Sequence, residues 1–245
     1  MEHKHIIFIH GFPFNHQCWN SQVEHFKPLL NVHTPDLRGH GKSASPPGPW
    51  MIHHFADDLL LFMNENKIEK AVICGLSMGG YVALHFVIEF PERVSALVLC
   101  DTRADADSNE AKDKRYVALK RVAENDYERF VSEFCLLALS KSSRYDEGQL
   151  KAQIESIALQ NDPKNMALAI GALASRRDSQ PYLDKIKCPV LVLVGEEDEI
   201  TPPEINEAIS KKISGCMFHK IEKAGHLSNM EQPETFNRYV EEFIS

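Results

Sequence analysis

Two hydrophobic patterns alternate along the chain, and each predicts a different element. Short apolar runs rich in Val, Ile and Leu indicate strands that are buried on both faces. Longer stretches in which apolar residues recur every three or four positions indicate amphipathic helices. Strands are predicted at residues 5–9, 31–35, 71–75, 95–100, 189–194 and 216–221, and helices at 54–66, 77–90, 202–213 and 234–244. Strands that alternate with helices predict an α/β fold with about six mostly parallel strands.

The alternation stops between residues 102 and 181, where the pattern is helical throughout. Phe130 and Phe134, for example, stand one helical turn apart on the same apolar face. A block of helices inserted between two strands must pack against the edge or the end of the sheet as a second layer. We therefore predict a helical cap over residues 102–181, on a core formed by residues 1–101 and 182–245.

A serine stands between glycines where a predicted strand becomes a predicted helix. Residues 75–79 read Gly-Leu-Ser-Met-Gly, which matches G-x-S-x-G in the strand–turn–helix context that this pattern requires. So sharp a turn forces Ser77 into unfavourable backbone angles, and such strain is typical of functional positions. The turn directs the hydroxyl towards the carboxyl ends of the strands, where open α/β sheets bind ligands. Ser77 is the candidate nucleophile, and the alternative is a serine that only caps a helix.

A serine nucleophile needs a base and an acid from elsewhere in the chain. The base removes the hydroxyl proton, and the acid fixes the tautomer of the base. In this kind of site the chain order is Ser, then Asp or Glu, then His. Asp198 and His226 each follow a predicted strand, so they lie in loops at strand carboxyl ends. We predict a triad of Ser77, Asp198 and His226, with Asp101 as the rival acid because it also ends a strand.

The negative charge that develops during attack needs backbone N–H donors. Met78 supplies one at the start of the predicted helix, where N–H groups have no helical acceptor. A loop with the sequence His-Gly-Phe-Pro follows the first strand, and its Pro13 has no N–H to donate. Phe12 is therefore the second candidate donor. His10 is expected to hold this loop through hydrogen bonds.

These motifs resemble those of the α/β-hydrolase superfamily, particularly its small capped esterases and lactonases. The chain carries, in the family's order, H-G-F at 10–12, D-L-R-G-H-G-K-S at 36–43, G-L-S-M-G-G at 75–80, G-E-E-D at 195–198 and A-G-H at 224–226. The resemblance covers nearly the whole chain. It implies the α/β-hydrolase fold, the same triad, and the Phe12 and Met78 amides as the oxyanion hole. Asp36 and Arg38 are expected to be structural.

The chain departs from the family in one respect: it begins at the strand that a β-hairpin usually precedes. One edge of the sheet is therefore expected to be more open than usual.

The resemblance implies a serine hydrolase that cleaves a small carboxylic ester or lactone through an acyl-enzyme, with no metal or organic cofactor. Ser77 stands where related dehalogenases and epoxide hydrolases carry an aspartate nucleophile. Residues 174–203 are similar to the corresponding segment of 3-oxoadipate enol-lactonases. Thioesterase, perhydrolase and C–C bond hydrolase activities use the same triad and stay open. A ligand-binding member of the fold without catalytic activity is the alternative from another class.

Two adjacent arginines, Arg176 and Arg177, end the helical block just before the chain returns to the sheet. An arginine at this junction is able to bind a substrate carboxylate in a bidentate manner, as an acidic enol-lactone would require. The alternative is an ion pair with Asp178, Asp184 or another acid, or a favourable charge at the helix end. The two arginines are candidate substrate-binding residues on the first interpretation only.

Composition and charge limit the possible class of protein, its partners and its location in the cell. The 245 residues are 43% hydrophobic and 25% charged, as in ordinary globular proteins, and the net charge is −8. This charge argues against nucleic-acid binding, which needs a basic face. The acidic pair Glu196 and Glu197 is expected to face solvent. We found no run as long as a membrane span and no secretory signal, so we expect a cytoplasmic protein without a membrane partner. The sequence assigns no oligomeric state.

Cysteine and histidine spacing indicates neither a disulfide framework nor a metal site. The six cysteines are scattered without C-x-x-C spacing, which suits a reduced compartment. The histidine pairs His3/His5 and His53/His54 have no carboxylate or cysteine at a recognisable ligand spacing. We therefore predict that the protein binds no metal.

Overall fold

The computed structural model describes residues 4–124, 126–145 and 149–245. At its centre lies a parallel sheet of six strands in the order β2-β1-β3-β4-β5-β6. The strands are β1 (His5–Ile9), β2 (Asn31–His33), β3 (Ala71–Leu76), β4 (Val94–Cys100), β5 (Val190–Gly195) and β6 (Met217–Ile221). The predicted fold class is confirmed, and each predicted strand lies within a residue or two of its expected position.

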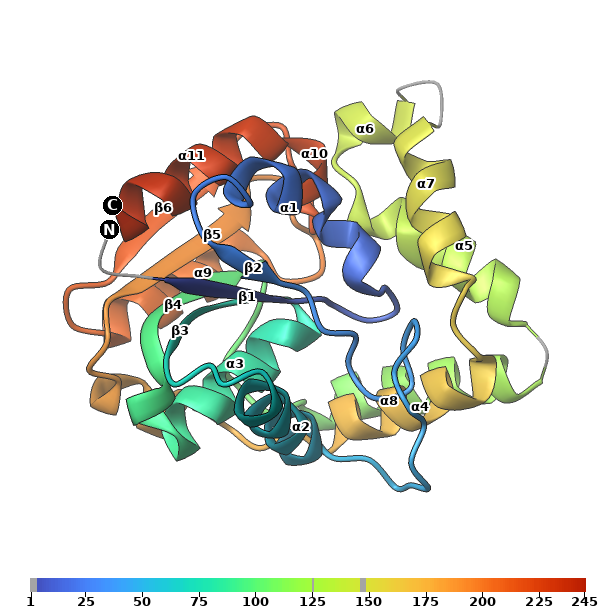
Figure 1. Cartoon of the computed structure of the whole chain (residues 1–245). Helices are drawn as coiled ribbons and strands as arrows, with labels where there is room; N and C mark the ends of the chain where they lie inside the picture. Colours follow the sequence, from blue (N-terminus) through green and yellow to red (C-terminus); the bar gives the residue numbers. More distant parts are fainter. Residues whose placement is uncertain (1–3, 125, 146–148) are drawn as a thin grey trace.

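Helices cover both faces of this sheet. Figure 1 shows α1 (Asn20–Phe26) and α11 (Pro233–Ile244) over one face, and α2 (Ile52–Glu65) and α3 (Met78–Glu89) over the other. Every residue of β3 and β5 is buried, which explains why their sequences are apolar on both faces. The remaining core elements are α9 (Pro203–Lys212), α10 (Ser228–Glu231) and the 3-10 helices η1 (His16–Trp19), η2 (Pro91–Arg93) and η3 (Gln180–Lys185).

Aromatic side chains fix α1 and α11 on the sheet. The ring of Trp19 lies 4.8 Å from that of Phe8 in β1 and 5.9 Å from that of Phe236 in α11. All three side chains are fully buried. Because β1 is thereby held at the centre of the core, the loop that follows it has a fixed starting point.

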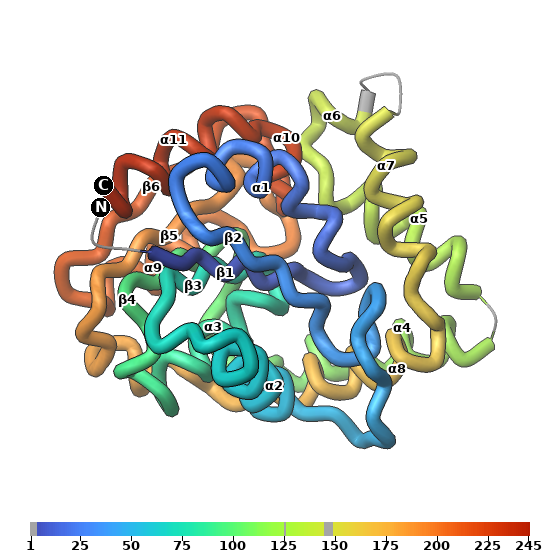
Figure 2. Tube along the Cα trace, in the orientation of Figure 1, coloured from blue at the N-terminus to red at the C-terminus, as the bar shows by residue number. Residues whose placement is uncertain are grey.

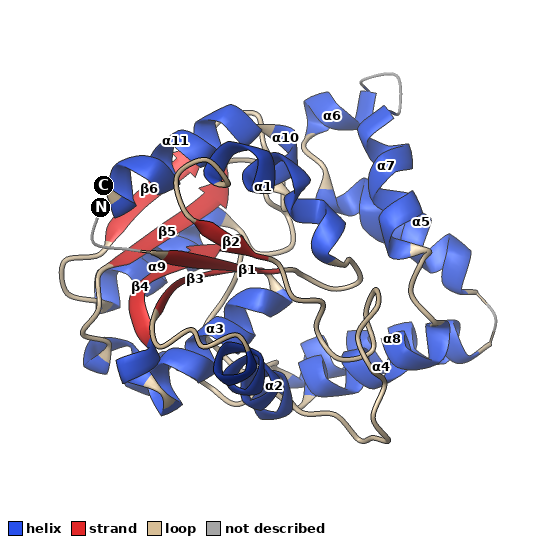
Figure 3. Cartoon of the chain, viewed as in Figure 1, coloured by secondary structure: helices blue, strands red, loops and turns tan. Residues whose placement is uncertain are grey.

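The chain leaves the sheet after β4 and forms a group of helices beside it before returning to β5. Figure 2 traces this path, and Figure 3 shows that its described residues form helices and loops, without a strand. The helices are α4 (Asn109–Ala123), α5 (Tyr127–Ala138), α6 (Lys141–Tyr145), α7 (Gln149–Ala158) and α8 (Pro163–Ala174). We call residues 109–174 the helical insert. Its helical character agrees with the sequence pattern, while the cap boundaries at 102 and 181 stay a prediction.

Two further findings bear on the expected setting. In the described part of the chain, no helix is both long enough and apolar enough to cross a membrane. The six cysteines are all free thiols.

Candidate active site

Ser77 occupies a strained turn between β3 and α3. Its backbone φ is +54°, a value that non-glycine residues rarely adopt. The flanking glycines allow this turn because the chain passes very close to itself. A Cβ on Gly75 would lie 2.3 Å from the Gly79 oxygen, and a Cβ on Gly79 would lie 2.1 Å from the Ile9 oxygen. The Ser77 side chain makes no capping hydrogen bond to α3, so the structure does not support the helix-cap interpretation.

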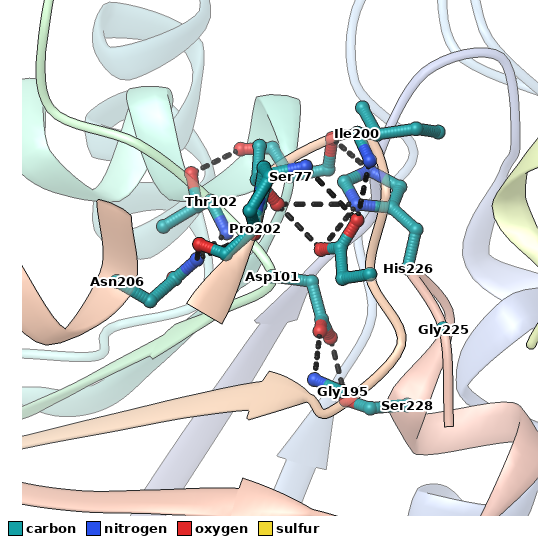
Figure 4. Close-up of polar contacts among 12 residues, drawn as sticks. Ser77, Asp101, Thr102, Gly195, Ile200, Pro202, Asn206, Gly225, His226 and Ser228 are labelled. Carbon is teal, nitrogen blue, oxygen red and sulfur yellow. Dashed lines mark hydrogen bonds and ion pairs between the residues drawn. The ribbon is translucent and has the colours of Figure 1, made fainter. Parts of the chain in front are cut away.

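A line of hydrogen bonds joins the three side chains that the sequence singled out. Ser77 Oγ lies 2.8 Å from His226 Nε2 (Figure 4). His226 Nδ1 lies 2.9 Å from Asp198 Oδ2. This geometry suits the tautomer in which Nδ1–H donates to the carboxylate and Nε2 accepts from the hydroxyl. Asp198 and His226 are buried, whereas Ser77 is half-buried. The hydroxyl is therefore accessible to a substrate while its partners are shielded from water.

Asp198 is held by its own loop in a set of donors. The Ile200 and Thr201 N–H groups donate to Oδ1 at 2.8 and 2.9 Å, and the Thr201 hydroxyl donates to Oδ2 at 2.6 Å. Burial alone would raise the pKa of Asp198, but the charge and hydrogen bond of His226 and the Thr201 bonds outweigh it. The pKa of Asp198 is thus lowered, and the side chain is ionised. Thr201 was not predicted from the sequence, although it is a hydroxyl residue three positions after the candidate acid.

The rival acid, Asp101, lies elsewhere in the same network. Its Oδ1 accepts the Gly195 N–H at 2.7 Å, and its Oδ2 lies 2.5 Å from the Ser228 hydroxyl oxygen (Figure 4). The carboxylate that contacts the His226 imidazole is that of Asp198. The structure therefore brings the preferred acid, Asp198, to the base.

The loop after β1 runs directly against the serine. A Cβ on Gly11 would lie 3.1 Å from the Ser77 Cβ, so the next residue, Phe12, is a near neighbour of the hydroxyl. Met78 is the first residue of α3, where helical N–H groups have no acceptor within the helix. Met78 thus follows Ser77 directly in the chain, and the loop that carries Phe12 packs against the serine, while their role as oxyanion donors stays a prediction.

His10 fixes this loop, as expected. The spacing suits a neutral ring, whose Nδ1–H donates to the Gly11 oxygen at 3.0 Å and whose Nε2 accepts the Leu37 N–H at 3.0 Å. Burial lowers the pKa of His10 to about 4, so the ring stays neutral. His10 therefore holds the candidate oxyanion loop in place.

The loop after β2 contains the two residues expected to be structural. Asp36 accepts the backbone N–H of His16 at 2.8 Å, and Arg38 binds both carboxylate oxygens of Asp58 at 2.6 and 2.7 Å. These contacts tie the loop to η1 and α2. They agree with the structural role expected for Asp36 and Arg38.

The loop that carries His226 is fixed by the end of α5 and the residues after it. The His226 N–H donates to the Ala138 oxygen at 2.8 Å. Glu231 bridges the two segments, because its carboxylate accepts the Gly225 N–H at 2.6 Å and the Ser140 N–H at 2.9 Å. Our sequence analysis missed Glu231, which has no motif around it. The helical insert therefore contributes directly to the position of the candidate base.

The acidic loop before Asp198 also meets the insert. Glu196 is exposed, as expected. Glu197 is half-buried and accepts the Lys141 N–H at 2.8 Å, so it faces solvent in part. This contact could not be predicted from the sequence, because the donor belongs to a distant segment.

Aromatic rings of α5 lie beside the candidate oxyanion loop. The Phe12 ring centroid lies 6.3 Å from that of Phe130 and 6.1 Å from that of Phe134, the latter edge-on. Phe14 lies 6.2 Å from Phe134 as well. Phe130 and Phe134 are only partly buried. The surroundings of the serine are therefore apolar on the side of the insert.

Arg176 and Arg177 are engaged in ion pairs at the junction of insert and sheet. The buried Arg176 contacts Asp107 at 2.6 Å, and its guanidinium lies 4.5 Å from the centroid of the Tyr81 ring. Arg177 contacts Glu89 at 2.8 Å, at the end of α3 remote from Ser77. These contacts favour the structural alternative, in which Asp107 and Glu89 are the acids that pair with the arginines. Substrate binding by either arginine stays a prediction.

Histidines and acids do not gather into a metal site anywhere in the described ranges. We found no group of three or more His, Cys, Asp or Glu side chains there that is arranged to hold an ion. His53 and His54 pack against each other with ring centroids 4.1 Å apart, and His5 contacts His33. His3 lies outside the described residues. The absence of a metal requirement stays a prediction.

Comparisons with known proteins extend this picture. Residues 4–233 match the family described as "alpha/beta hydrolase fold". A thermophilic esterase from Thermogutta terrifontis is 37% identical and superimposes with a TM-score of 0.95, covering 98% of this chain and 89% of that one. 3-Oxoadipate enol-lactonase 2 of Acinetobacter baylyi is 28% identical over 236 residues, which are 96% of this chain and 86% of the relative.

A third relative has a different name. A putative 2-succinyl-6-hydroxy-2,4-cyclohexadiene-1-carboxylate synthase of Bacillus subtilis is 28% identical over 250 residues, covering 98% of this chain and 90% of the relative. The resemblance seen in the motifs is confirmed, and so is the expected enzyme class. With the matched region extending through nearly all of its sequence, this chain belongs to the α/β-hydrolase fold family and is a hydrolase.

Proposed function

We propose that this protein hydrolyses a small carboxylic ester or lactone, with Ser77 as nucleophile, His226 as general base and Asp198 as the acid that orients it. The observation that carries the proposal is the continuous line from Ser77 Oγ to His226 Nε2, at 2.8 Å, and from His226 Nδ1 to Asp198, at 2.9 Å. A strained turn that holds the serine in this line supports it.

The first half of the reaction forms an acyl-enzyme. Ser77 Oγ attacks the carbonyl carbon while its proton passes to His226 Nε2. The carbonyl oxygen becomes an oxyanion and accepts hydrogen bonds from the Phe12 and Met78 N–H groups. When the tetrahedral intermediate collapses, the bond to the leaving oxygen breaks and His226 returns its proton to that oxygen. The ionised Asp198 stabilises the positive imidazolium during both steps.

The second half releases the acid. His226 Nε2 takes a proton from water, and the resulting hydroxide attacks the acyl carbon bound to Ser77. Collapse of this intermediate breaks the Oγ–acyl bond, and the proton returns to Ser77. The cycle needs only this chain and water.

The surroundings of the serine favour an apolar, uncharged substrate. Phe12, Phe130 and Phe134 gather on the side of the insert. The guanidinium groups of Arg176 and Arg177 are each paired with a carboxylate. Relatives named as an esterase and an enol-lactonase support an ester or a lactone as the substrate. The free thiols support a cytoplasmic location.

A covalent probe and a substrate panel test the proposal together. A fluorophosphonate should label the wild-type protein at Ser77 and leave Ser77→Ala unlabelled. The panel contains p-nitrophenyl esters, lactones and acyl thioesters, and the highest kcat/KM is expected for an ester or lactone. A preference for thioesters would replace the proposal with a thioesterase. A labelled protein inactive on the whole panel would point to perhydrolase or C–C bond chemistry, and a protein that is neither labelled nor active would be a ligand-binding member of the fold.

A further inference from the structure

Two successive residues after β4 contact all three segments that carry the proposed triad (Figure 4). The Thr102 hydroxyl donates to the backbone oxygen of Ser77 at 2.8 Å. The Asp101 carboxyl group contacts Gly195, three positions before Asp198, and Ser228, two positions after His226. The end of β4 is therefore placed to set the three segments relative to one another.

Thr102 is also connected to Asp198 by a series of hydrogen bonds. Asn206 Oδ1 accepts the Thr102 N–H at 3.2 Å, and Asn206 Nδ2 donates to the Thr201 oxygen at 2.8 Å. Thr201 in turn holds both oxygens of Asp198. The fit around Thr102 is tight, because a Cβ on Gly80 would lie 2.3 Å from its hydroxyl oxygen. Small shifts of Thr102 would therefore reach both the nucleophile and the acid.

The carboxyl group of Asp101 has an unusual environment. It is fully buried, and its two hydrogen-bond partners, a backbone N–H and a hydroxyl, are neutral. The charged groups that face it are the carboxylates of Asp198 and Glu231, and the imidazole of His226 lies beyond Asp198. Among the described residues no lysine or arginine pairs with Asp101. Burial, and then the negative charge of Asp198, raise the pKa of Asp101 well above its usual range.

We propose that Asp101 and Thr102 are positioning residues for the triad and that Asp101 acts as a neutral carboxylic acid. In this form one Asp101 oxygen accepts the Gly195 N–H, and the acid O–H donates to Ser228 Oγ across the observed 2.5 Å, whereas an ionised Asp101 would accept the Ser228 O–H instead. A neutral group fixes both loops and leaves Asp198 as the single negative charge that contacts His226. The catalytic part of this inference rests on the proposed function, whereas the protonation state does not.

Asparagine and alanine at position 101 separate the geometry from the charge. Asparagine reproduces both hydrogen bonds of a neutral acid and tolerates the positive φ of this residue, +46°. Alanine removes both bonds. We expect Asp101→Asn to keep most of kcat, and Asp101→Ala to lose roughly 100-fold with little change in KM, because misplacement by about 1 Å costs that much. Rates are divided by the fraction of sites labelled by fluorophosphonate, so that unfolded protein does not count.

The outcomes of that pair decide between three roles. Equal losses of kcat in Asp101→Asn and Asp101→Ala would show that the charge is needed, which overturns the neutral acid. Wild-type kcat in Asp101→Ala would overturn the positioning role. A fall in the pH midpoint of kcat/KM by about one unit in Asp101→Asn would reveal a lost negative charge beside the base, and would also overturn neutrality. An unchanged midpoint supports it.

Thermal unfolding tests the protonation state without any activity. If Asp101 stays protonated when folded, the folded protein keeps a proton that the unfolded chain loses above its ordinary pKa, near ~3.9. Stability of the wild type then falls as pH rises, and asparagine does not share this loss. We expect the Tm of Asp101→Asn, relative to wild type, to rise steadily between about pH 5 and 8. A constant or falling difference would mean that Asp101 is ionised. This measurement stays decisive even if the wild type cleaves no ester.

Thr102 has its own matched pair. Thr102→Ser keeps the hydroxyl that binds the Ser77 oxygen, and Thr102→Val keeps the shape without it. We expect Thr102→Val to lower kcat about 10-fold at unchanged KM and Thr102→Ser to restore most of it. Equal kcat values for the two variants would remove Thr102 from the positioning role.

Discussion

The sheet and the helical insert contribute to the same site in different ways. Each proposed triad residue follows a strand that is hydrogen-bonded into the sheet, so the sheet determines where the reacting groups lie. The insert exposes more apolar surface: in α4, Tyr116 is 71% exposed and Val117 is 58% exposed. It reaches the reacting groups through a few contacts, among them the Ala138 oxygen and the rings of α5. The difference suggests that the sheet supplies the chemistry and the insert supplies the selectivity.

Removing reacting groups from the sheet should have the largest effect. Ser77→Ala and His226→Ala are each expected to lower kcat by roughly 10⁴-fold or more. The double variant should be little worse, because the two residues act as a unit. Steady-state rates on a p-nitrophenyl ester, with folding checked by circular dichroism, measure this. If the single losses multiply in the double variant, the two side chains do not share one step.

Acidification should also affect the triad, which the sheet positions. His226 must be unprotonated to accept the serine proton, so kcat/KM is expected to fall about 10-fold per pH unit on the acidic side. Asp198 does not add to this fall between pH 5 and 8, because its pKa is held below the usual range by His226 and Thr201 despite burial. A rate profile on a substrate without titrating groups measures the effect. A flat profile from about pH 5 to 8 would remove His226 from the role of base.

Changes in the insert should alter preference more than rate. Phe130→Ala and Phe134→Ala are expected to change the ratio of kcat/KM between long and short acyl chains by about 10-fold, as lost apolar contacts do in other pockets. Tyr116→Ala is the matched control, since it removes an exposed ring from α4. Ratios measured across an ester panel decide. If they are the same in all three variants, α5 does not line the substrate pocket.

The junction arginines should have the smallest effect on the reaction. Arg176→Met breaks a buried pair with Asp107 and is expected to cost about 3 kcal/mol of stability. Arg177→Met breaks a half-exposed pair with Glu89, worth less than about 1 kcal/mol. Neither should change the ratio of rates on acidic and neutral esters. A KM that rises about 10-fold for the acidic ester alone would restore the substrate anchor.

The strand ends were predictable because each has a local cause. Gly75 and Gly79 stand at the two positions of the turn where a side chain would clash with the backbone, so their spacing identifies Ser77 without any knowledge of the fold. Asp198 and His226 follow β5 and β6, whose parallel pairing brings the two residues to the same edge of the sheet. Where neighbouring residues determine the geometry, the sequence is enough.

Contacts between distant segments were not predictable. Glu231 joins the His226 loop to Ser140, and Asn206 joins Thr102 to Thr201. No motif or fixed spacing in the sequence predicts these hydrogen bonds, because each depends on how the insert and α9 pack against the sheet. The junction arginines illustrate the same limit. Their partners come from parts of the chain that no local pattern connects to them.

The chain segments that lead into and out of the helical insert are hydrogen-bonded to each other. The Ser179 N–H donates to the Ala104 oxygen at 2.8 Å, and Arg176 adds a bond to the Asp105 oxygen. The entropy of closing a loop grows only slowly with its length. The number of residues between these two segments should therefore have little effect on the stability of the sheet. Residues 105–178 are therefore a segment that could be exchanged for the corresponding segment of a relative. A grafted segment must still supply the contacts that the insert makes with the site, namely a carbonyl oxygen for the His226 N–H and backbone N–H groups for Glu231 and Glu197.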